Sequence, residues 1–503
     1  MSADELIQSK KNERRESMRG LVTQIKHYSI AVAIPALISL LSSAIFTRLF
    51  EINEYGIYAS VFSIVGIVTT VLSQLFKQPI VRYASGGKEE EIEKILTLTF
   101  YGLILVSVLI TTVILLLFNN KFFLDYREYL IPSGIFGILS ITFSIMSAIL
   151  QSQLQSAYYS KIEVLNNVFK FIFSVLFAFS LSKSPVALLW GAIAAWMLLF
   201  FPLLRRLKSD VVLTVRVKMY KVKELLHSSR KMLMYGTPMM IWFLASSVLS
   251  ISDRIIINIF RGSEEVGIYS ASYNLVSGTI GLISMPVSIA AYPFLMSAWS
   301  KGHKGEVVHW LGTVSAMILS SGIVLLGGCW LFYVDIAEIF LGENFRVGSS
   351  IMPVALAGMV FMSFAHYAHK PFEFYEKTTN IMLLIIFIAL INIILNVLLV
   401  PFFGYKIAAW TTLICYFLYS IFGYLSGRKL LNWSVKWKLP VVTLCSAVFA
   451  IAVVKLISYY FVIENVFLHL LLGISFYTLV CLIPLAMIYK KQILVTMRKR
   501  IKG

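Results

Sequence analysis

The chain has 503 residues, of which 58% are hydrophobic and only 14% are charged. Soluble domains carry about 25% charged residues. This composition, with a mean hydropathy of +0.82, therefore excludes a soluble globular protein and indicates an all-α polytopic membrane protein.

The first 27 residues are polar and contain no apolar segment ahead of a cleavage site, so they are interpreted as a cytoplasmic segment and not as a signal peptide. Apolar stretches of about 20 residues, each long enough to cross a hydrocarbon core of roughly 30 Å, follow along the whole chain. We predict fourteen membrane-spanning helices, at 28–49, 56–83, 95–118, 129–150, 162–182, 185–204, 233–259, 266–296, 307–333, 347–368, 379–400, 403–426, 439–460 and 465–489.

The positive charges are distributed unevenly between the two sides of the membrane. Most of the 44 Lys and Arg residues fall on one side, with clusters at 10–26, 205–231 and 490–502. Because cationic loops resist translocation, both termini and the 205–231 loop are predicted to be cytoplasmic. The net charge of +19 then belongs to a membrane face beside anionic headgroups and does not indicate a nucleic-acid surface.

Two sequence landmarks are repeated. NEYGIYASVF at 53–62 returns 211 residues later as EEVGIYSASY at 264–273, and IAAW occurs at 193–196 and at 407–410. Repetition at nearly one offset predicts two six-helix lobes related by a pseudo-two-fold axis, with a cavity between them. The predicted parts are a cytoplasmic segment (1–27), an N-lobe (28–206), a basic cytoplasmic linker (207–232), a C-lobe (233–426), helices 13 and 14 (427–489) and a basic cytoplasmic tail (490–503).

Polar residues inside the spans are candidates for a substrate pathway, because charges that face lipid are costly. In the seventh helix, Ser250, Asp253 and Arg254 belong to a polar stripe with steps of three and four residues. Ser39 and Ser43 stand at equivalent places in the first helix. We expect both stripes to line the cavity. Alternatively, Asp253 and Arg254 are near enough to the external helix end to reach the lipid headgroups.

Lys170 is the strongest single candidate for a cavity residue. It lies near the predicted midplane, with Asn166 and Asn167 one turn earlier on the same helix face. A cavity role and pairing within a helix interface are both open for Lys170, and Lys77 is either a cavity residue or a snorkelling one. Glu163 is assigned to a helix end, so no mid-membrane carboxylate is expected in the first six helices. The mainly cationic buried charge favours an anionic substrate such as a phosphate or pyrophosphate.

Sequence patterns for catalysis are weak. There is no phosphate-binding loop, hydrolase nucleophile motif or HExxH pattern, and the four cysteines have no metal-ligand spacing. His366 and His369 are more typical of interfacial polar residues than of a metal site. We therefore expect neither an enzyme nor a metal or organic cofactor.

Several motifs together resemble those of a known family. Arg48 followed by EYGIY, PIVRYASGG with Arg82, SDRIIINIF before EVGIY, and FFGYKIAAW resemble the polysaccharide repeat-unit (Wzx-type) flippases of the multidrug, oligosaccharidyl-lipid and polysaccharide exporter superfamily. The resemblance covers essentially the whole chain. The positions that match family motifs are Arg48, Gly56, Tyr58, Arg82, Asp253, Gly267 and Tyr269.

The resemblance implies a two-lobed flippase in the bacterial cytoplasmic (inner) membrane. Its implied substrate is an undecaprenyl-diphosphate-linked oligosaccharide, moved from the cytoplasmic to the outer leaflet for O antigen (lipopolysaccharide), capsule or a similar polymer. Membrane lipids, a polysaccharide polymerase and a chain-length regulator are the further expected partners. Coupling to the membrane potential, to H⁺ or to Na⁺ is allowed but not required, because the interior-negative potential already favours outward movement of negative charge.

Other functions stay open at this stage. A peptidoglycan-precursor flippase would also carry a polyprenyl diphosphate. A multidrug cation antiporter of the same superfamily is opposed by the expected lack of a carboxylate in the first lobe. A membrane-embedded polymerase or ligase should carry a large external loop, and the predicted external loops are short.

Overall fold

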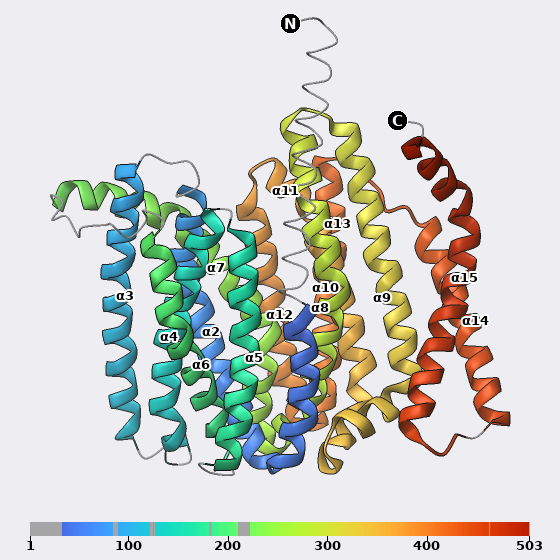
Figure 1. The fold of residues 1–503 in the computed structure, drawn as a ribbon, viewed down its shortest axis with the longest axis horizontal. Coiled ribbons are helices and arrows are strands. Elements are labelled where there is room, and N and C mark those ends of the chain that lie inside the picture. The colour runs from blue at the N-terminus through green and yellow to red at the C-terminus, as the bar shows by residue number, and fades with distance from the viewer. Residues whose placement is uncertain are drawn as a thin grey trace, which may run out of the picture. The chain divides into compact units, whose positions relative to one another are not determined.

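A computed structural model describes residues 33–501 apart from 84–88, 121–123, 125, 154, 181–183, 210–221 and 462. Regular structure in this part of the chain is helical throughout (Figure 1). The helices are Ala33–Leu49, α2 (Ile52–Tyr83), α3 (Glu89–Phe118), α4 (Arg127–Ser152), α5 (Ser156–Ser180), α6 (Val186–Ser209), α7 (Val222–Arg261), α8 (Ser263–Ser300), α9 (Lys304–Phe340), the 3₁₀ helix η2 (Glu343–Ile351), α10 (Met352–Ala368), α11 (Lys370–Phe374), α12 (Thr378–Phe403), α13 (Tyr405–Leu430), α14 (Lys438–Tyr460) and α15 (Val466–Ile501).

Twelve helical segments of the described chain are long and apolar enough to cross a membrane. They account for every predicted span except 28–49 and 266–296, where the structure has the helix Ala33–Leu49 and α8. A helix satisfies its backbone hydrogen bonds internally and so leaves its apolar side chains available to face lipid. The prediction of an all-α polytopic membrane protein is confirmed.

Several helices extend beyond the predicted apolar spans. α5 begins at Ser156, six residues before its predicted start, and α6 continues to Ser209. α7 begins at Val222, so residues 222–232 of the predicted linker are helical, while 210–221 lie outside the described residues. Helix geometry does not require apolar side chains, and hydropathy therefore underestimates the length of helices that project past the hydrocarbon.

The chain forms two compact units, of which the first comprises residues 1–38, 57–251 and 288–290. Within this unit α5 packs along α6, and α4 packs on α6. The indole of Trp196 on α6 lies 4.7 Å from the ring of Phe136 and 6.2 Å from that of Phe143, both on α4. Trp196 is 4% exposed and belongs to the core of the unit. This packing holds the indole in a fixed position between α4 and α5.

The second compact unit comprises residues 39–56, 252–287 and 291–503. α10 and α12 pack on α13, while α14 and α15 pack on each other and on α9 (Figure 1). Phe332 of α9, Ala450 of α14 and Tyr477 of α15 meet in one apolar core. The two helices outside the sequence repeat are thus attached to this unit through α9. The lobe boundaries and the pseudo-two-fold axis stay predictions.

The two copies of the repeated motif contact each other in the second unit. A Cβ atom on Gly56, near the start of α2, would lie 3.0 Å from the backbone nitrogen of Gly267 and would overlap the carbonyl of Ser263. A Cβ atom on Gly267, near the start of α8, would overlap the carbonyl of Ile52. The Ser263 hydroxyl also donates a hydrogen bond to Asn53 Oδ1. Only glycine permits the two helices to approach so closely, which explains the glycine in each copy.

Candidate functional site

One face of α5 carries a group of polar residues inside the first unit. Glu163, Asn166, Asn167 and Lys170 recur at steps of three and four residues, so they lie along one side of the helix. Asn166 is buried and the other three are half-buried. The ammonium of Lys170 lies 4.3 Å from the centroid of the Trp196 ring, and a desolvated cation–π contact of this kind is worth about 2 kcal/mol. Lys170 therefore points toward α6 inside the unit and not toward lipid.

Glu163 is a candidate site residue that the sequence analysis did not select. Because α5 begins at Ser156, Glu163 lies two turns into the helix and not at its end. Its half-buried carboxylate interacts electrostatically with the ammonium groups of Lys170 and of Lys77 on α2. The assignment of Glu163 to a helix end is therefore wrong, because this carboxylate lies within the candidate membrane span Ala157–Ser180. Lys77, Glu163 and Lys170, hereafter the α5 cluster, combine two cations with one anion.

The two asparagines beside the α5 cluster differ in their hydrogen bonding. Asn167 donates a hydrogen bond from Nδ2 to the Glu163 carbonyl, 2.9 Å away, and so serves its own helix. The Oδ1 atom of Asn166 is buried and has no hydrogen-bond partner among the described residues. A buried acceptor without a donor costs about 1–3 kcal/mol. A ligand hydroxyl or a water that donates to Asn166 would remove this cost.

Asp253 on α7 is the centre of a second polar cluster, in the second unit. It is 1% exposed. Its carboxylate accepts hydrogen bonds from the Tyr269 hydroxyl at 2.6 Å, from Asn396 Nδ2 at 2.7 Å and from the Thr412 hydroxyl at 2.7 Å. The donors come from α8, α12 and α13, and hydrogen bonds of this kind offset the cost of burying a carboxylate. The alternative in which Asp253 reaches the lipid headgroups is wrong.

Asparagines of α12 extend the Asp253 cluster. Asn396 Nδ2 also lies 3.2 Å from Asn392 Oδ1, which accepts a hydrogen bond from the Ser252 hydroxyl at the same distance. Asn392 Nδ2 donates in turn to the Thr412 hydroxyl. The sequence analysis did not select these residues, although Asn392 and Asn396 stand one turn apart in an otherwise apolar stretch of α12. That spacing is a usable signal of a polar face, but it does not reveal which helix the face meets.

Arg254 has different partners from its neighbour Asp253, as the roughly 100° between consecutive helix residues requires. Its Nη2 donates to Asn274 Oδ1 at 2.7 Å, and its guanidinium lies 5.3 Å from the centroid of the Tyr273 ring. The Nε atom is buried and has no acceptor among the described residues. Arg254 thus retains one N–H donor that an anionic oxygen could use.

The predicted serines have local roles. The hydroxyl of Ser250 donates to the Ser247 carbonyl of its own helix. Ser43 is buried, its carbonyl accepts a hydrogen bond from the Thr47 hydroxyl at 2.6 Å, and Ser39 is half-buried. The structure thus joins Asp253 with residues of three other helices and brings Lys170 and Lys77 to the same carboxylate, Glu163, but it adds none of these three serines to either cluster.

The motif residues of the family resemblance have mainly structural contacts. Tyr269 donates to Asp253, and Gly56 and Gly267 allow the close contact of α2 with α8. Tyr58 stacks on Phe62 with ring centroids 5.6 Å apart. The side chain of Arg82 lies outside the described residues.

Arg48 caps the carboxyl end of α9. Its Nη2 donates to the Ile339 carbonyl at 2.8 Å and to the Glu338 carbonyl at 3.3 Å, while Nη1 donates to Ala44 of its own helix. Arg346 of η2 also donates to the Glu338 carbonyl, at 3.1 Å. Helix carboxyl ends leave carbonyls without partners and carry a partial negative charge, so cations stabilise them.

We expect Arg48→Ala to lower the stability of the second unit by about 1 kcal/mol, the usual value for such a cap. Thermal unfolding in one detergent measures the effect. Arg48 and Arg346 share an acceptor, so their effects on stability should be coupled. The loss of stability in the double variant should therefore differ from the sum of the losses in the two single variants. Strict additivity would mean that the two caps act independently.

The two clusters offer charge and hydrogen bonds inside an apolar bundle. The described residues contain no group of three or more His, Cys, Asp and Glu that could hold a metal ion. The oxygen atoms around Asp253 are of the type that small hard cations prefer. Groups of this kind lower the cost of moving a polar or charged solute through hydrocarbon, which otherwise reaches tens of kcal/mol for an ion.

Solved structures define the class of this fold. The chain aligns with the inward closed conformation of the lipid II flippase MurJ with a TM-score of 0.74 and 16% identity, over 93% of this chain and 99% of that one. It aligns with an inward-facing multidrug resistance MATE family transporter of the MOP superfamily with a TM-score of 0.64 and 13% identity, over 80% and 98% of the two chains. The fold is therefore that of MurJ and the MATE transporters.

The sequence itself defines the family. Residues 22–299, more than half of the chain, match the polysaccharide biosynthesis protein family, and residues 238–398 match the MatE family. The chain belongs to the polysaccharide biosynthesis protein family, which confirms the resemblance to flippases of this superfamily. An uncharacterized membrane protein of Methanocaldococcus jannaschii is 27% identical over 248 residues, which are 48% of this chain and 47% of that protein. The match thus spans about half the length of that curated relative.

Proposed function

We propose that this protein is a flippase that moves undecaprenyl-diphosphate-linked oligosaccharide repeat units from the cytoplasmic to the outer leaflet of the bacterial cytoplasmic membrane. The observation that supports this most is the α5 cluster, with two lysines inside the spans of a polysaccharide biosynthesis family protein. Lysines attract the diphosphate and amide oxygens accept from sugar hydroxyls. The exported unit would enter O antigen, capsule or a similar polymer, with a polymerase and a chain-length regulator acting after this step.

Glu163 has a definite part in this mechanism. In the empty protein its carboxylate reduces the cost of keeping Lys77 and Lys170 charged in an apolar bundle. An arriving diphosphate competes with Glu163 for the two ammonium groups, so the cluster exchanges one anion for another. The lipid tail stays in the bilayer while the head group passes. Outward movement of negative charge is favoured by about 2.3 kcal/mol per charge per 100 mV, so H⁺ or Na⁺ coupling would add to the driving force but is not needed.

The proposal is tested by depleting the protein and identifying the lipid-linked intermediate that accumulates. We expect an undecaprenyl-diphosphate-linked oligosaccharide, protected from enzymes added outside intact cells. The fold shared with MurJ over 93% of the chain favours a peptidoglycan-precursor flippase as the second candidate. Accumulation of the peptidoglycan precursor, with cell lysis, would support that candidate and contradict ours.

A multidrug cation antiporter is the third candidate function. The expected lack of a carboxylate in the first lobe opposed it, and Glu163 removes that objection. The α5 cluster still holds more cationic than anionic groups, and the polysaccharide biosynthesis match covers the first unit's helices. Both observations favour an anionic substrate. Substitution of Glu163 therefore separates the two functions directly.

Both termini and the 205–231 segment are predicted to face the cytoplasm, because that orientation leaves most cationic residues on the inner side. Cysteine labelling tests this in a variant without Cys329, Cys415, Cys445 and Cys481. We expect Glu464→Cys, an exposed position between α14 and α15, to react with an impermeant reagent in intact cells. Val215→Cys should react only after the membrane is opened. The reverse pattern would invert the topology and the proposed direction of transport.

A further inference from the structure

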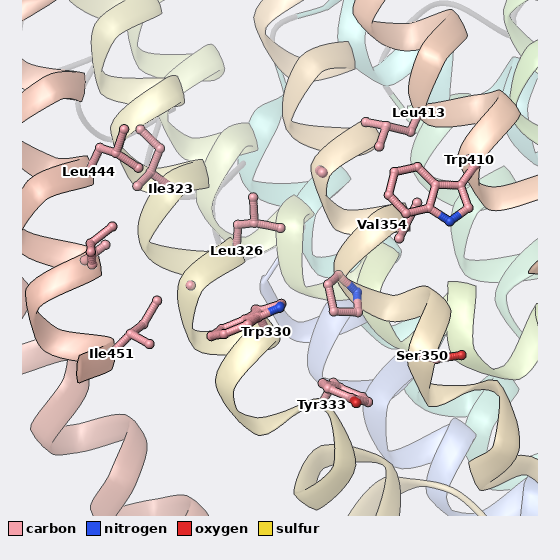
Figure 2. Close-up of a pocket in the computed structure, with 15 residues that line it drawn as sticks. Ile323, Leu326, Trp330, Tyr333, Ser350, Val354, Trp410, Leu413, Leu444 and Ile451 are labelled. Carbon is pink, nitrogen blue, oxygen red and sulfur yellow. The ribbon is translucent and has the colours of Figure 1, made fainter. Parts of the chain in front are cut away.

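The second unit contains an apolar groove that neither polar cluster touches. Its volume is about 540 Å³, within the range of small-molecule sites. Four elements form its walls, as Figure 2 shows: α9, the segment from η2 into α10, α13 and α14. α14 packs mainly on α9 and α15, so the groove lies where α14 stands apart from α10 and α13.

The groove changes in polarity along its length. Ile323, Leu413 and Leu444 lie at one end, and Tyr333 and Ser350 lie at the other (Figure 2). The side chains between them are apolar or indoles. Tyrosine and tryptophan favour the level at which hydrocarbon meets headgroups. The end with Tyr333 and Ser350 is therefore the headgroup end, which is the outer leaflet in the predicted topology.

A lysine stands at the headgroup end. Leu444, Val448, Ile451 and Lys455 follow one face of α14 at steps of three and four residues. The first three line the groove, and the exposed ammonium of Lys455 lies 4.4 Å from the centroid of the Trp330 ring, which also lines it. No ion pair among the described residues includes Lys455.

The opposite wall also has a lysine near a residue that lines the groove. On α13, Lys406 is exposed one turn before Trp410, which lines the groove. The acidic Asp335 of α9 is paired with His469 of α15 at 3.0 Å. The helices of two walls thus each carry an exposed lysine within about a turn of a groove-lining residue, while this neighbouring carboxylate already has its own partner.

We propose that the groove binds one anionic phospholipid, with an acyl chain against α9, α10 and α14 and its phosphate beside Lys455. The length of the groove along α14 matches a lipid in one leaflet of the bilayer. Leu444 and Lys455 are eleven residues apart, about 16 Å along a helix, and half of the hydrocarbon core is about 15 Å. The lipid fills the space between α14 and the wall of α10 and α13. Bound there, it stabilises the attachment of α14 to the second unit.

Thermal unfolding of the purified full-length protein, with phosphatidylglycerol or phosphatidylcholine added at equal mole fraction, tests the site. We expect phosphatidylglycerol to raise the melting temperature more than phosphatidylcholine. Native mass spectrometry should show one retained phosphatidylglycerol. Lys455→Ala should weaken its binding about fivefold, as expected for one lysine contact at a membrane surface, and Lys438→Ala, an exposed lysine at the other end of α14, should not.

A second pair of variants tests the groove itself. Val448 is 59% exposed and lines the groove, so Val448→Trp fills it without entering the core, and Val397→Trp places the same bulk at a 42% exposed position outside it. Only Val448→Trp should remove the retained phosphatidylglycerol and its stabilising effect. Equal effects of the two lipids, or equal loss in both tryptophan variants, would overturn the proposal. Displacement of phosphatidylglycerol by undecaprenyl phosphate at equal mole fraction would also overturn it, in favour of a substrate-tail site.

Discussion

Lys170→Glu is expected to abolish surface polysaccharide while the protein stays in the membrane at near-normal abundance. The change replaces an ammonium that would attract the diphosphate with a carboxylate that repels it, and it removes the cation over the Trp196 ring. Lys170→Ala should reduce export strongly. Lys170→Arg should retain part of the activity, because it keeps the charge and the aromatic contact. Surface polymer and membrane protein level are measured together in complemented deletion cells.

The matched control for this prediction is Lys161→Glu. Lys161 lies on the same helix but is exposed, so the same charge reversal there should leave export unchanged. If Lys170 only pairs within the bundle, Lys170→Ala should act through abundance or melting temperature instead. Full export by a normally abundant Lys170→Glu protein would refute the site assignment and leave the proposed function standing.

Glu163→Gln distinguishes an anion carrier from a cation antiporter. If the α5 cluster binds a diphosphate, removal of the competing carboxylate leaves two lysines and should preserve export. If the cluster binds a cation, Glu163 is the group that binds it, and the same change should abolish transport. Loss of export in a stable Glu163→Gln protein would therefore favour the antiporter mechanism.

The sequence was sufficient to predict a polytopic membrane protein, because hydropathy and the spacing of apolar segments determine that class. It was not sufficient to predict where the helices end. The stretch before Ile162 contains serine, tyrosine and lysine and was assigned to a loop, yet α5 begins at Ser156. Because the predicted start was less than two turns too late, Glu163 was assigned to a helix end, although it lies within α5 and belongs to the α5 cluster. Apolar content thus locates a span within a few residues, and a charge near its boundary cannot be classified from hydropathy.

Contacts between distant segments were a second limit. The repeat identified Gly56 and Gly267, but only the structure shows that the two copies meet. Arg48 was selected through a family motif, whereas its acceptors lie near residue 339, some 290 positions along the chain. Sequence periodicity fixes which side chains share a helix face. It does not fix which helix that face contacts, so the partners of Asp253 and Arg48 had to come from the fold.

The largest effect on stability is expected for Asp253→Ala. Tyr269, Asn396 and Thr412 would lose their shared acceptor at a position that is 1% exposed. An unsatisfied buried group costs about 1–3 kcal/mol, and partial rearrangement of the three donors brings the expected total to about 3 kcal/mol. The melting temperature in one detergent, read with membrane abundance, measures the loss.

The control variants for Asp253 test whether the loss of stability increases with the number of hydrogen bonds removed. Tyr269→Phe deletes one of the three donors and should cost about 1 kcal/mol, clearly less than Asp253→Ala. Ser250→Ala lies one turn earlier on α7 and removes a hydroxyl that serves only its own helix, so it should change stability by less than about 0.5 kcal/mol. Asp253→Asn keeps an acceptor and should fall between Tyr269→Phe and Asp253→Ala. If Asp253→Ala melted at the same temperature as Ser250→Ala, the carboxylate would not be what joins α7 to α8, α12 and α13.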